Sequence, residues 1–515
     1  MNPCPPAVPA RFALLSRLLR IPARLPPRAL FGRVLLPVAA LPFIAGCSAG
    51  LFGNSGPDYT PPDARAAAAA WQAPQADIAG IPAPHEGSPQ RLAEWWSQFR
   101  DPALDALIAA AQAASGTLVQ AAAAIERSRA DLIAAGVAAH PSLDIAGSIN
   151  RAAFTLGGPL AYRSQTQLGL QSSWEIDLFG ALARQRESAR AQYEANIAQW
   201  HEARVSLAAE VANTYLNIRY CAIQSAQAEA DARSRSASTR AIEAAGKAGL
   251  QSDAAVALAR ASAAEAAAAL TQRRSQCELL VKGLVALTAM HEPALRKLLS
   301  PAESGASRLP EPARFRVESV PARALAQRPD IAAAERRVAA ASAEIGRADA
   351  DRYPRLTLAG NILPTRISIN SGPTLGLTTW SIGPSLLLPL LDGGRRAANV
   401  DAARAQFAAA EADYRTRVRG AVREVEEALV RLASAAERSA DTATAASGYR
   451  SNLSALDTKY RAGLASLVEL EDARRLSIAG DAALTSLEQE RVAAWISLYR
   501  AIGGGWDREA ALAAR

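Results

Sequence analysis

The sequence has 515 residues, 50% of them hydrophobic but only 5% aromatic, and its formal net charge is +8. Plentiful alanine with few aromatic residues favours long helices and is not typical of a multi-helix membrane protein. Six arginines precede residue 47 and no acidic residue occurs among the first 57, so the basic charge belongs largely to the N-terminal segment and does not indicate a nucleic-acid partner.

The N-terminal segment resembles a secretory signal peptide, because a short apolar stretch at 34–46 follows the arginine-rich start. The stretch ends at Ile44-Ala45-Gly46-Cys47, which is similar to the lipobox of bacterial lipoproteins. Cleavage of 1–46 would leave Cys47 to carry a diacylglycerol and an N-acyl chain. Ser48, directly after the cysteine, resembles the residue at this position in lipoproteins that are sorted to the outer membrane. The alternative is a plain signal peptide with an incidental cysteine.

Beyond residue 90 the sequence repeats itself at a spacing near 214 residues. The segment Lys247-Ala248-Gly249-Leu250, for example, corresponds to Arg461-Ala462-Gly463-Leu464. Each half predicts a helix, a strand, a loop, a strand, a very long helix, a turn and a further helix. We therefore expect two structurally similar repeats, 91–290 and 322–502.

Three segments break this pattern. Residues 47–90 are rich in Pro, Gly and Ala and are expected to form an extended tether. A proline-rich linker at 291–321 joins the two repeats, and a C-terminal tail at 503–515 begins with three glycines. The linker and the tail are expected to lie outside the helical layer.

Four segments alternate between apolar and polar residues, at about 142–150, 165–176, 355–364 and 377–389. Their length of about ten residues suits a tilted strand that crosses a bilayer. No run of 18 apolar residues follows the leader, so no transmembrane helix is predicted, and a membrane-spanning part must be a closed β-barrel. Because such a barrel needs at least about eight strands, several chains must share one.

Two helices are expected to be unusually long. Residues 181–245 contain neither proline nor glycine, and 395–460 contain only Gly420 and Gly448. About 65 residues span roughly 100 Å as a helix, which exceeds any single globular core. These helices must pack side by side as coiled coils, as in a tube that crosses the periplasm.

Cys221 and Cys277 are placed symmetrically about the expected turn at Gly249, 28 residues before it and 28 after it. In an antiparallel hairpin they would lie level with each other. A disulfide is therefore a hypothesis for an oxidising periplasm, and two buried free thiols are the alternative.

Signals for catalysis are absent from the sequence. The four histidines stand at 85, 140, 201 and 291 without ligand spacing, and there is no P-loop, nucleophile elbow or dinucleotide fingerprint. We expect neither an enzyme nor a metal site.

Several motifs together are similar to those of TolC-like outer-membrane factors, in particular the NodT-type efflux lipoproteins. The resemblance covers about 91–506. Its motifs are Trp95-Trp96 with Phe99 and Asp101-Pro102, Trp174-Glu175-Ile176-Asp177-Leu178-Phe179-Gly180, Arg328-Pro329-Asp330-Ile331 and Lys459-Tyr460-Arg461-Ala462-Gly463.

The resemblance implies a mostly α fold with membrane β structure. It implies a homotrimer whose twelve-stranded outer-membrane β-barrel, four strands per chain, continues as a long periplasmic α-helical barrel, with 291–321 at an equatorial domain. Such a protein is a passive exit duct of a tripartite efflux system. Its partners would be a periplasmic membrane-fusion adaptor, an inner-membrane transporter of the RND or another type, and outer-membrane lipid.

The resemblance also implies a periplasmic gate at the hairpin tips. Glu469 and Asp472 match acidic positions that ring the constriction, and three copies around one axis should raise their pKa values and favour cation binding. Tyr460 matches a position that ties the tip helices by hydrogen bonding, although the family's basic partner falls near Ala465. The alternative for the acidic pair is an ordinary solvated helix face. Asp253 lies near the acidic tip position of the first hairpin.

The turns Gly249-Leu250 and Gly463-Leu464 match the tips that contact the adaptor. A plain turn explains the glycines but less well a leucine repeated at both tips. Two other functions remain open: the same fold could serve type I protein secretion, or the chain could be a periplasmic coiled-coil structural lipoprotein. The latter should show one hairpin and a lipoyl-like β domain.

Overall fold

The computed structural model describes residues 53–62, 71–73, 95–155, 157–300, 309, 325–370 and 372–508. The chain divides into two compact units, Met1–Phe52 and Gly53–Arg515, and all described residues belong to the second. The predicted signal 1–46, Cys47, and most of the tether and the linker therefore lie outside the described residues.

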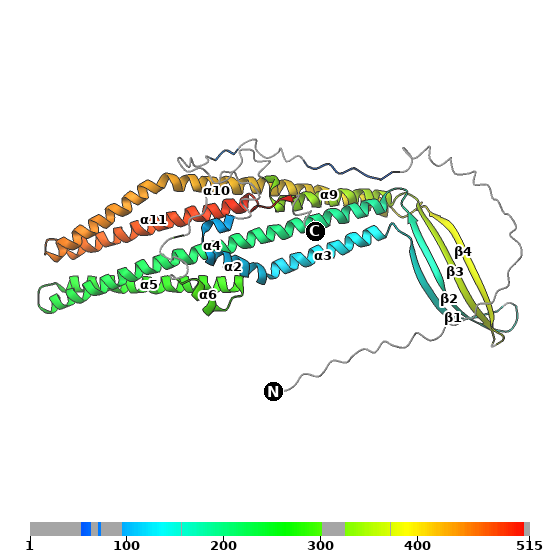
Figure 1. Cartoon of the computed structure of the whole chain (residues 1–515), viewed down its shortest axis with the longest axis horizontal. Helices are drawn as coiled ribbons and strands as arrows, with labels where there is room; N and C mark the ends of the chain where they lie inside the picture. The colour runs from blue at the N-terminus through cyan, green and yellow to red at the C-terminus, as the bar shows by residue number, and fades with distance from the viewer. Residues whose placement is uncertain are drawn as a thin grey trace, which may run out of the picture. The chain divides into compact units, whose positions relative to one another are not determined.

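The same order of elements occurs twice along the chain (Figure 1). A 3-10 helix, η2, and a short helix, α2, come first, and a further short helix, α6, follows the first hairpin. The series α3-β1-β2-α4-α5 then recurs as α9-β3-β4-α10-α11, and α4 and α10 have 67 residues each. The bounds are η2 Trp95–Phe99, α2 Pro102–Ala114, α3 Gly116–Val137, β1 Ser142–Phe154, β2 Ala161–Ile176, α4 Ala181–Lys247, α5 Asp253–Thr288, α6 Glu292–Leu298, α9 Pro329–Ala350, β3 Arg355–Ile369, β4 Leu375–Leu387, α10 Arg395–Arg461 and α11 Leu467–Ala501.

The four strands form one antiparallel sheet in the order β1-β2-β3-β4. They are 13 to 16 residues long, and β1, β2 and β3 are longer than predicted because backbone pairing continues past the alternating residues, as far as Phe154 opposite Ala161. The register places the predicted apolar residues of all four strands on one face. That face is exposed in the single chain, with Ile149 at 84% and Trp380 at 72%.

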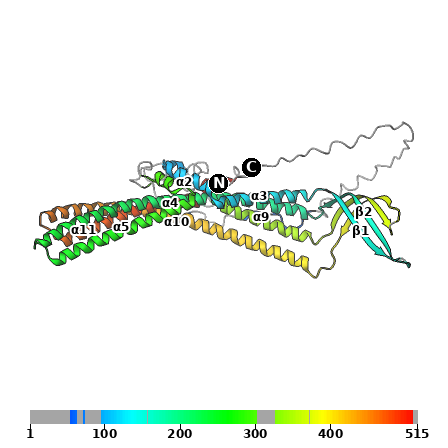
Figure 2. The same cartoon turned by 90° about the horizontal axis from the view of Figure 1, so that it is seen from below.

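The helices form two long antiparallel hairpins, α4 with α5 and α10 with α11, while α9 packs against both α4 and α10 (Figure 2). The main core lies where η2 and α2 meet α4, α5, α10 and α11. Trp95 is fully buried there and stacks on Tyr499 with ring centroids 4.6 Å apart. Asp101 caps α2, and its side chain accepts hydrogen bonds from the backbone N–H groups of Ala103 and Leu104.

The described part of the tether contains no helix or strand and packs against the helices. Arg184 of α4 donates to Asp58 at 2.8 Å and to the carbonyl of Ser55 at 3.1 Å. At Gly56 the chain approaches Gly346 of α9 so closely that a Cβ on either residue would collide with the other segment. Residues 53–62, which we call the strap, therefore pack between α4 and α9.

The expectation that the tail lies outside the helical layer is wrong for its described part. Trp506 is 4% exposed and packs on Ala198, Ala332 and Ala333. The three glycines at 503–505 have positive φ angles, which let the chain turn back so that the indole is buried.

By length and hydropathy, one helix among the described residues is apolar enough to cross a membrane, namely α5, and the bent pair of α2 and α3 passes the same test together. Alanine supplies much of this hydropathy without forming an unbroken apolar run, which is why the sequence predicted no such helix. In the structure α5 packs along α4 and is covalently joined to it. We therefore assign α5 to the helical hairpin.

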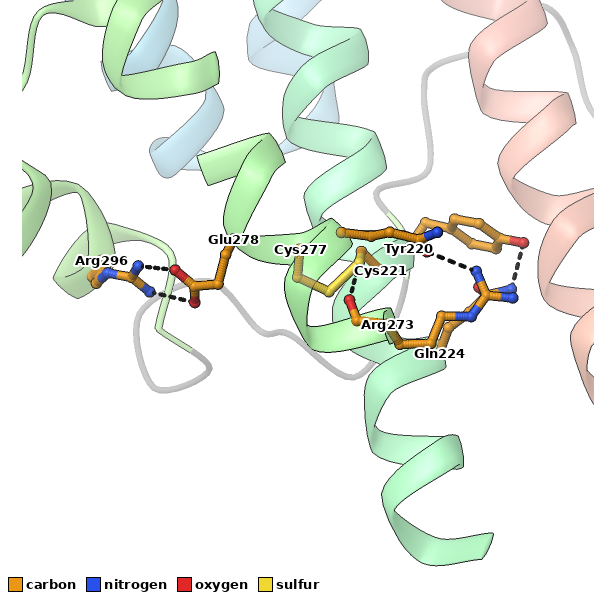
Figure 3. Close-up of a disulfide and its surroundings, with 8 residues drawn as sticks. Tyr220, Cys221, Gln224, Arg273, Cys277, Glu278 and Arg296 are labelled. Carbon is orange, nitrogen blue, oxygen red and sulfur yellow. Dashed lines mark hydrogen bonds and ion pairs between the residues drawn. A yellow bond between two sulfur atoms is a disulfide. The ribbon is translucent and has the colours of Figure 1, made fainter. Parts of the chain in front are cut away.

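A disulfide joins Cys221 of α4 to Cys277 of α5, with the two Cα atoms 5.6 Å apart (Figure 3). The two residues lie level in the antiparallel pair and are separated by 56 residues in sequence. Next to the bond, Arg296 of α6 pairs with Glu278 of α5, so α6 is held against the same end of the hairpin (Figure 3).

Replacing both cysteines by serine is expected to lower the free energy of unfolding, because the unfolded chain then gains loop entropy. The chain-entropy relation gives roughly 4 kcal/mol for a loop of this size. Guanidinium unfolding followed by circular dichroism measures the change, and wild-type protein under reductant should match the variant. Alkylation of either cysteine in unreduced, denatured protein would contradict the bond.

Candidate functional site

Both long hairpins end in the same turn. Gly249 and Gly463 adopt the left-handed conformation, with φ of 73° and 75°. In the first turn the N–H of Gly249 donates to the carbonyl of Gly246 at 2.9 Å, and that of Leu250 donates to Ala245 at 2.8 Å. The equivalent hydrogen bonds of the second turn measure 3.0 and 2.8 Å. This Schellman pattern satisfies the last carbonyls of α4 and α10.

The turns present leucines to solvent. Leu250 is 76% exposed and Leu464 is 78% exposed, although a hydrophobic residue at this position of a Schellman turn commonly packs back on the helix. Two residues later Ser252 and Ser466 cap the returning helices, each accepting a hydrogen bond from the backbone three positions on. The two tips therefore share the same backbone conformation, the same serine cap and an exposed leucine.

Glu469 belongs to a capping box at the start of α11. Its Oε2 accepts hydrogen bonds from the backbone N–H of Ser466 at 2.7 Å and from the Ser466 hydroxyl at 2.8 Å. These hydrogen bonds, the backbone one foremost, hold the pKa of Glu469 below its ordinary value. This lowering of the pKa is opposite to the rise in pKa predicted for three carboxylates around one axis, because a single chain supplies only one copy of Glu469.

Asp472 lies one turn further along the same face of α11 and pairs with Arg475, and both side chains are exposed. Asp253 is exposed in the first turn of α5, in the other hairpin. In the single chain the predicted gate carboxylates are thus held by residues of their own helix end. Among the described residues no group of histidine, cysteine and acidic side chains could hold a metal ion.

Tyr460 contributes to the tips by packing. Within the part of the chain that the structure describes, its hydroxyl has no hydrogen-bond partner, whereas its ring packs against a small apolar cluster shared by all four tip helices. The cluster, which we call the tip cluster, comprises Ile242, Val256, Ala259, Tyr460 and Leu467. Tyr460 makes no such tie among the described residues of one chain, so the hydrogen-bonded tie stays a prediction for the assembled protein.

A network of buried charges joins the two hairpins behind the tip cluster. Arg235 of α4 donates to both carboxylate oxygens of Asp231, at 3.0 and 2.9 Å, and to the hydroxyl of Ser262 in α5 at 2.7 Å. Ser262 in turn donates to Oε2 of Glu471 in α11 at 2.8 Å, an oxygen that lies 3.3 Å from Arg235 Nη1. Arg474 donates to the other oxygen of Glu471.

We call these five residues the inter-hairpin network. Its four charged side chains are 7 to 13% exposed and comprise two cations and two anions, so the buried charge is balanced. Glu471 stands between the predicted gate residues Glu469 and Asp472. The same turn of α11 therefore carries the predicted gate carboxylates and the side chain that connects α11 to the first hairpin.

This network is not among the features predicted from the sequence. The spacing of Asp231 with Arg235 and of Glu471 with Arg474 indicates a pair on one helix in each case, which the pattern alone could have suggested. The contact between the pairs depends on how the hairpins pack, and no sequence spacing expresses it.

Replacing Glu471 by alanine is expected to lower the free energy of unfolding by about 3–5 kcal/mol, because Arg235 and Arg474 lose their shared buried carboxylate. Guanidinium unfolding measures the effect. Glu490→Ala on the same helix is the matched control, since the Glu490–Arg438 pair is exposed and such pairs contribute roughly 1 kcal/mol or less. Equal effects of the two substitutions would show that the network does not fasten the hairpins.

Comparison with known proteins agrees with this architecture. The model of a family described as outer membrane efflux protein matches residues 107–289 and 320–504. Nodulation protein T of Rhizobium leguminosarum bv. viciae is 29% identical over 476 residues, which cover 88% of this chain and 90% of that protein. The solvent efflux pump outer membrane protein SrpC of Pseudomonas putida is 29% identical over 479 residues, covering 92% of this chain and 98% of that protein.

The fold is also similar to a solved structure. The outer-membrane channel OprN superposes with a TM-score of 0.78 at 28% identity, covering 88% of this chain and 100% of OprN. The relatives are outer-membrane channel proteins, and the chain is not an enzyme. Since the family model matches more than half of the sequence and falls once on each repeat, the chain belongs to the outer membrane efflux protein family.

Proposed function

We propose that the protein is the exit duct of a tripartite efflux system and works as a homotrimer. The sheet is the observation that carries this proposal. Its four strands have two open edges and one exposed apolar face, so it cannot stand in lipid alone. Three copies would supply twelve strands for a closed barrel, and α3, α4, α9 and α10 would continue it as a helical barrel in the periplasm.

The membrane anchor is part of the proposal. Removal of 1–46 and acylation of Cys47 would attach the chain to the outer membrane, as the lipobox-like sequence predicts. The strap supports this arrangement, because it begins six residues after Cys47 in the sequence and packs on α4 and α9, which adjoin strands along the chain.

The hairpin tips are proposed to contact a periplasmic adaptor. The exposed Leu250 and Leu464 support this, because two matching apolar side chains on turns with the same hydrogen bonds offer an adaptor the same contact at each hairpin. An inner-membrane transporter, of the RND or another type, would supply the energy. The duct itself would conduct passively.

Small molecules are the proposed cargo. The relative SrpC is the outer membrane protein of a solvent efflux pump, which supports small-molecule efflux over protein secretion. Type I protein secretion through the same fold is the second candidate. A structural lipoprotein is disfavoured, because the chain has two long hairpins and a four-stranded membrane-type sheet.

The mass of the mature protein in detergent tests the proposal. Native mass spectrometry should show a trimer whose chains begin at a lipid-modified Cys47. A monomer that stays soluble without detergent would contradict the shared barrel and would favour the structural lipoprotein.

Replacing Glu469 and Asp472 together by alanine is expected to raise pore conductance or leak and to weaken block by divalent cations, because three pairs of carboxylates leave the constriction. Planar-bilayer recording measures both quantities. The matched variant Glu469→Gln/Asp472→Asn removes the charge but leaves a side chain that can complete the capping box at residue 469.

If charge controls the gate, both double variants lose cation block to the same degree. Loss of cation block in the alanine variant alone would show that the block depends on the capping box and not on the charge. Unchanged conductance and block in both would contradict the acidic gate.

A further inference from the structure

The end of the sheet remote from the helices carries positive charge only. Between residues 145 and 174 and between 356 and 391 the sequence contains three charged residues, Arg151, Arg163 and Arg366, and no Asp or Glu. All three lie near the loops that join β1 to β2 and β3 to β4. This end faces the exterior if the helices are periplasmic, so the inference below rests on the proposed function.

The strand register divides these arginines between the two faces. Arg151 is opposite Ser164, and Arg366 is opposite Thr166, on the face of β2 that carries Leu168 and Leu170. Arg151 and Arg366 therefore lie on the apolar face, at its outer margin. Arg163 occupies the alternate position of β2 and belongs to the polar face, where glutamines follow it.

The two arginines can reach one small ligand. They stand on β1 and β3 with β2 between them, and their partners on β2 are two residues apart, so their Cα atoms are roughly 12 Å apart. The guanidinium of Arg151 lies over the ring of Tyr162, with Cζ 5.4 Å from the ring centroid, which holds it on this face. Both side chains are exposed, and neither forms an ion pair within the described residues.

A guanidinium on a lipid-facing surface is costly unless it reaches the head-group layer and finds an anion there. Its planar fork of donors matches a phosphate, which can accept two parallel hydrogen bonds. No carboxylate in this part of the chain can take that role. We propose that Arg151 and Arg366 bind the phosphate of a lipid head group in the outer leaflet, with Tyr162 positioning Arg151.

Native mass spectrometry of the full chain in detergent, titrated with diphosphoryl lipid A, tests this proposal. The variant Arg151→Gln/Arg366→Gln is expected to bind the lipid at least about tenfold more weakly than wild type. Arg163→Gln, at the same end but on the polar face, is the matched control and should stay within about twofold of wild type. Lipid A without phosphates should bind wild-type protein as weakly as lipid A binds the double variant.

Equal affinity of the three proteins for lipid A would overturn the proposal, as would equal binding of wild type to the phosphorylated and dephosphorylated lipids. The second comparison needs no substitution and so does not depend on the folding of a variant. Displacement of the lipid by millimolar inorganic phosphate would identify free phosphate as the ligand and overturn the lipid assignment.

The same spectra separate this inference from the proposed function. Trimers that bind lipid without selectivity would refute the arginine site and leave the exit duct standing. Detergent-independent monomers would refute the duct itself.

Discussion

Unpaired backbone groups along the outer edges of β1 and β4 constrain the rest of the molecule. The sheet order is β1-β2-β3-β4, so each edge strand pairs on one side only. One face of the sheet is apolar and exposed, and lipid offers no hydrogen bonds to a free edge. In the proposed homotrimer, strands from further copies pair with these edges. Because α3, α4, α9 and α10 continue directly from the strands, a shared ring of strands implies a shared ring of helices.

Closure at the sheet does not hold the far ends of the helices, since α4 and α10 each run for 67 residues. At those ends the inter-hairpin network fastens α11 to α4 and α5 through buried charges. A buried ion pair is a weak source of net stability compared with apolar packing, but losing one partner is costly. The network therefore contributes more to the choice of one arrangement of the hairpins than to the stability of that arrangement. The neighbouring tip cluster, which includes Tyr460, supplies apolar contact nearer the tips.

The strands, the long helices and the tip turns could be predicted from the sequence because each depends on local chemistry. Alternation indicates strands, an absence of proline marks long helices, and Gly463 marks a turn. The capping box of Ser466 and Glu469 is equally local, because its Ser-x-x-Glu spacing is visible in the sequence. The pairing of Arg235 with Glu471 could not be predicted, because residues 236 positions apart meet only through hairpin packing. The buried tail was mispredicted because three glycines suggested a free end, whereas Trp506 supplies the apolar surface that draws it in.

The disulfide breaks the equivalence of the two repeats. Positions 214 residues after Cys221 and Cys277 are Ala435 and Arg491, so the second hairpin has no covalent counterpart. Sliding of α5 along α4 is blocked at one level by a bond, whereas sliding of α11 along α10 is opposed only by side-chain contacts. Reducing conditions would therefore remove a covalent restraint from the first hairpin, whereas the contacts between α10 and α11, the helices of the hairpin that carries Glu469 and Asp472, contain no bond that reduction could break.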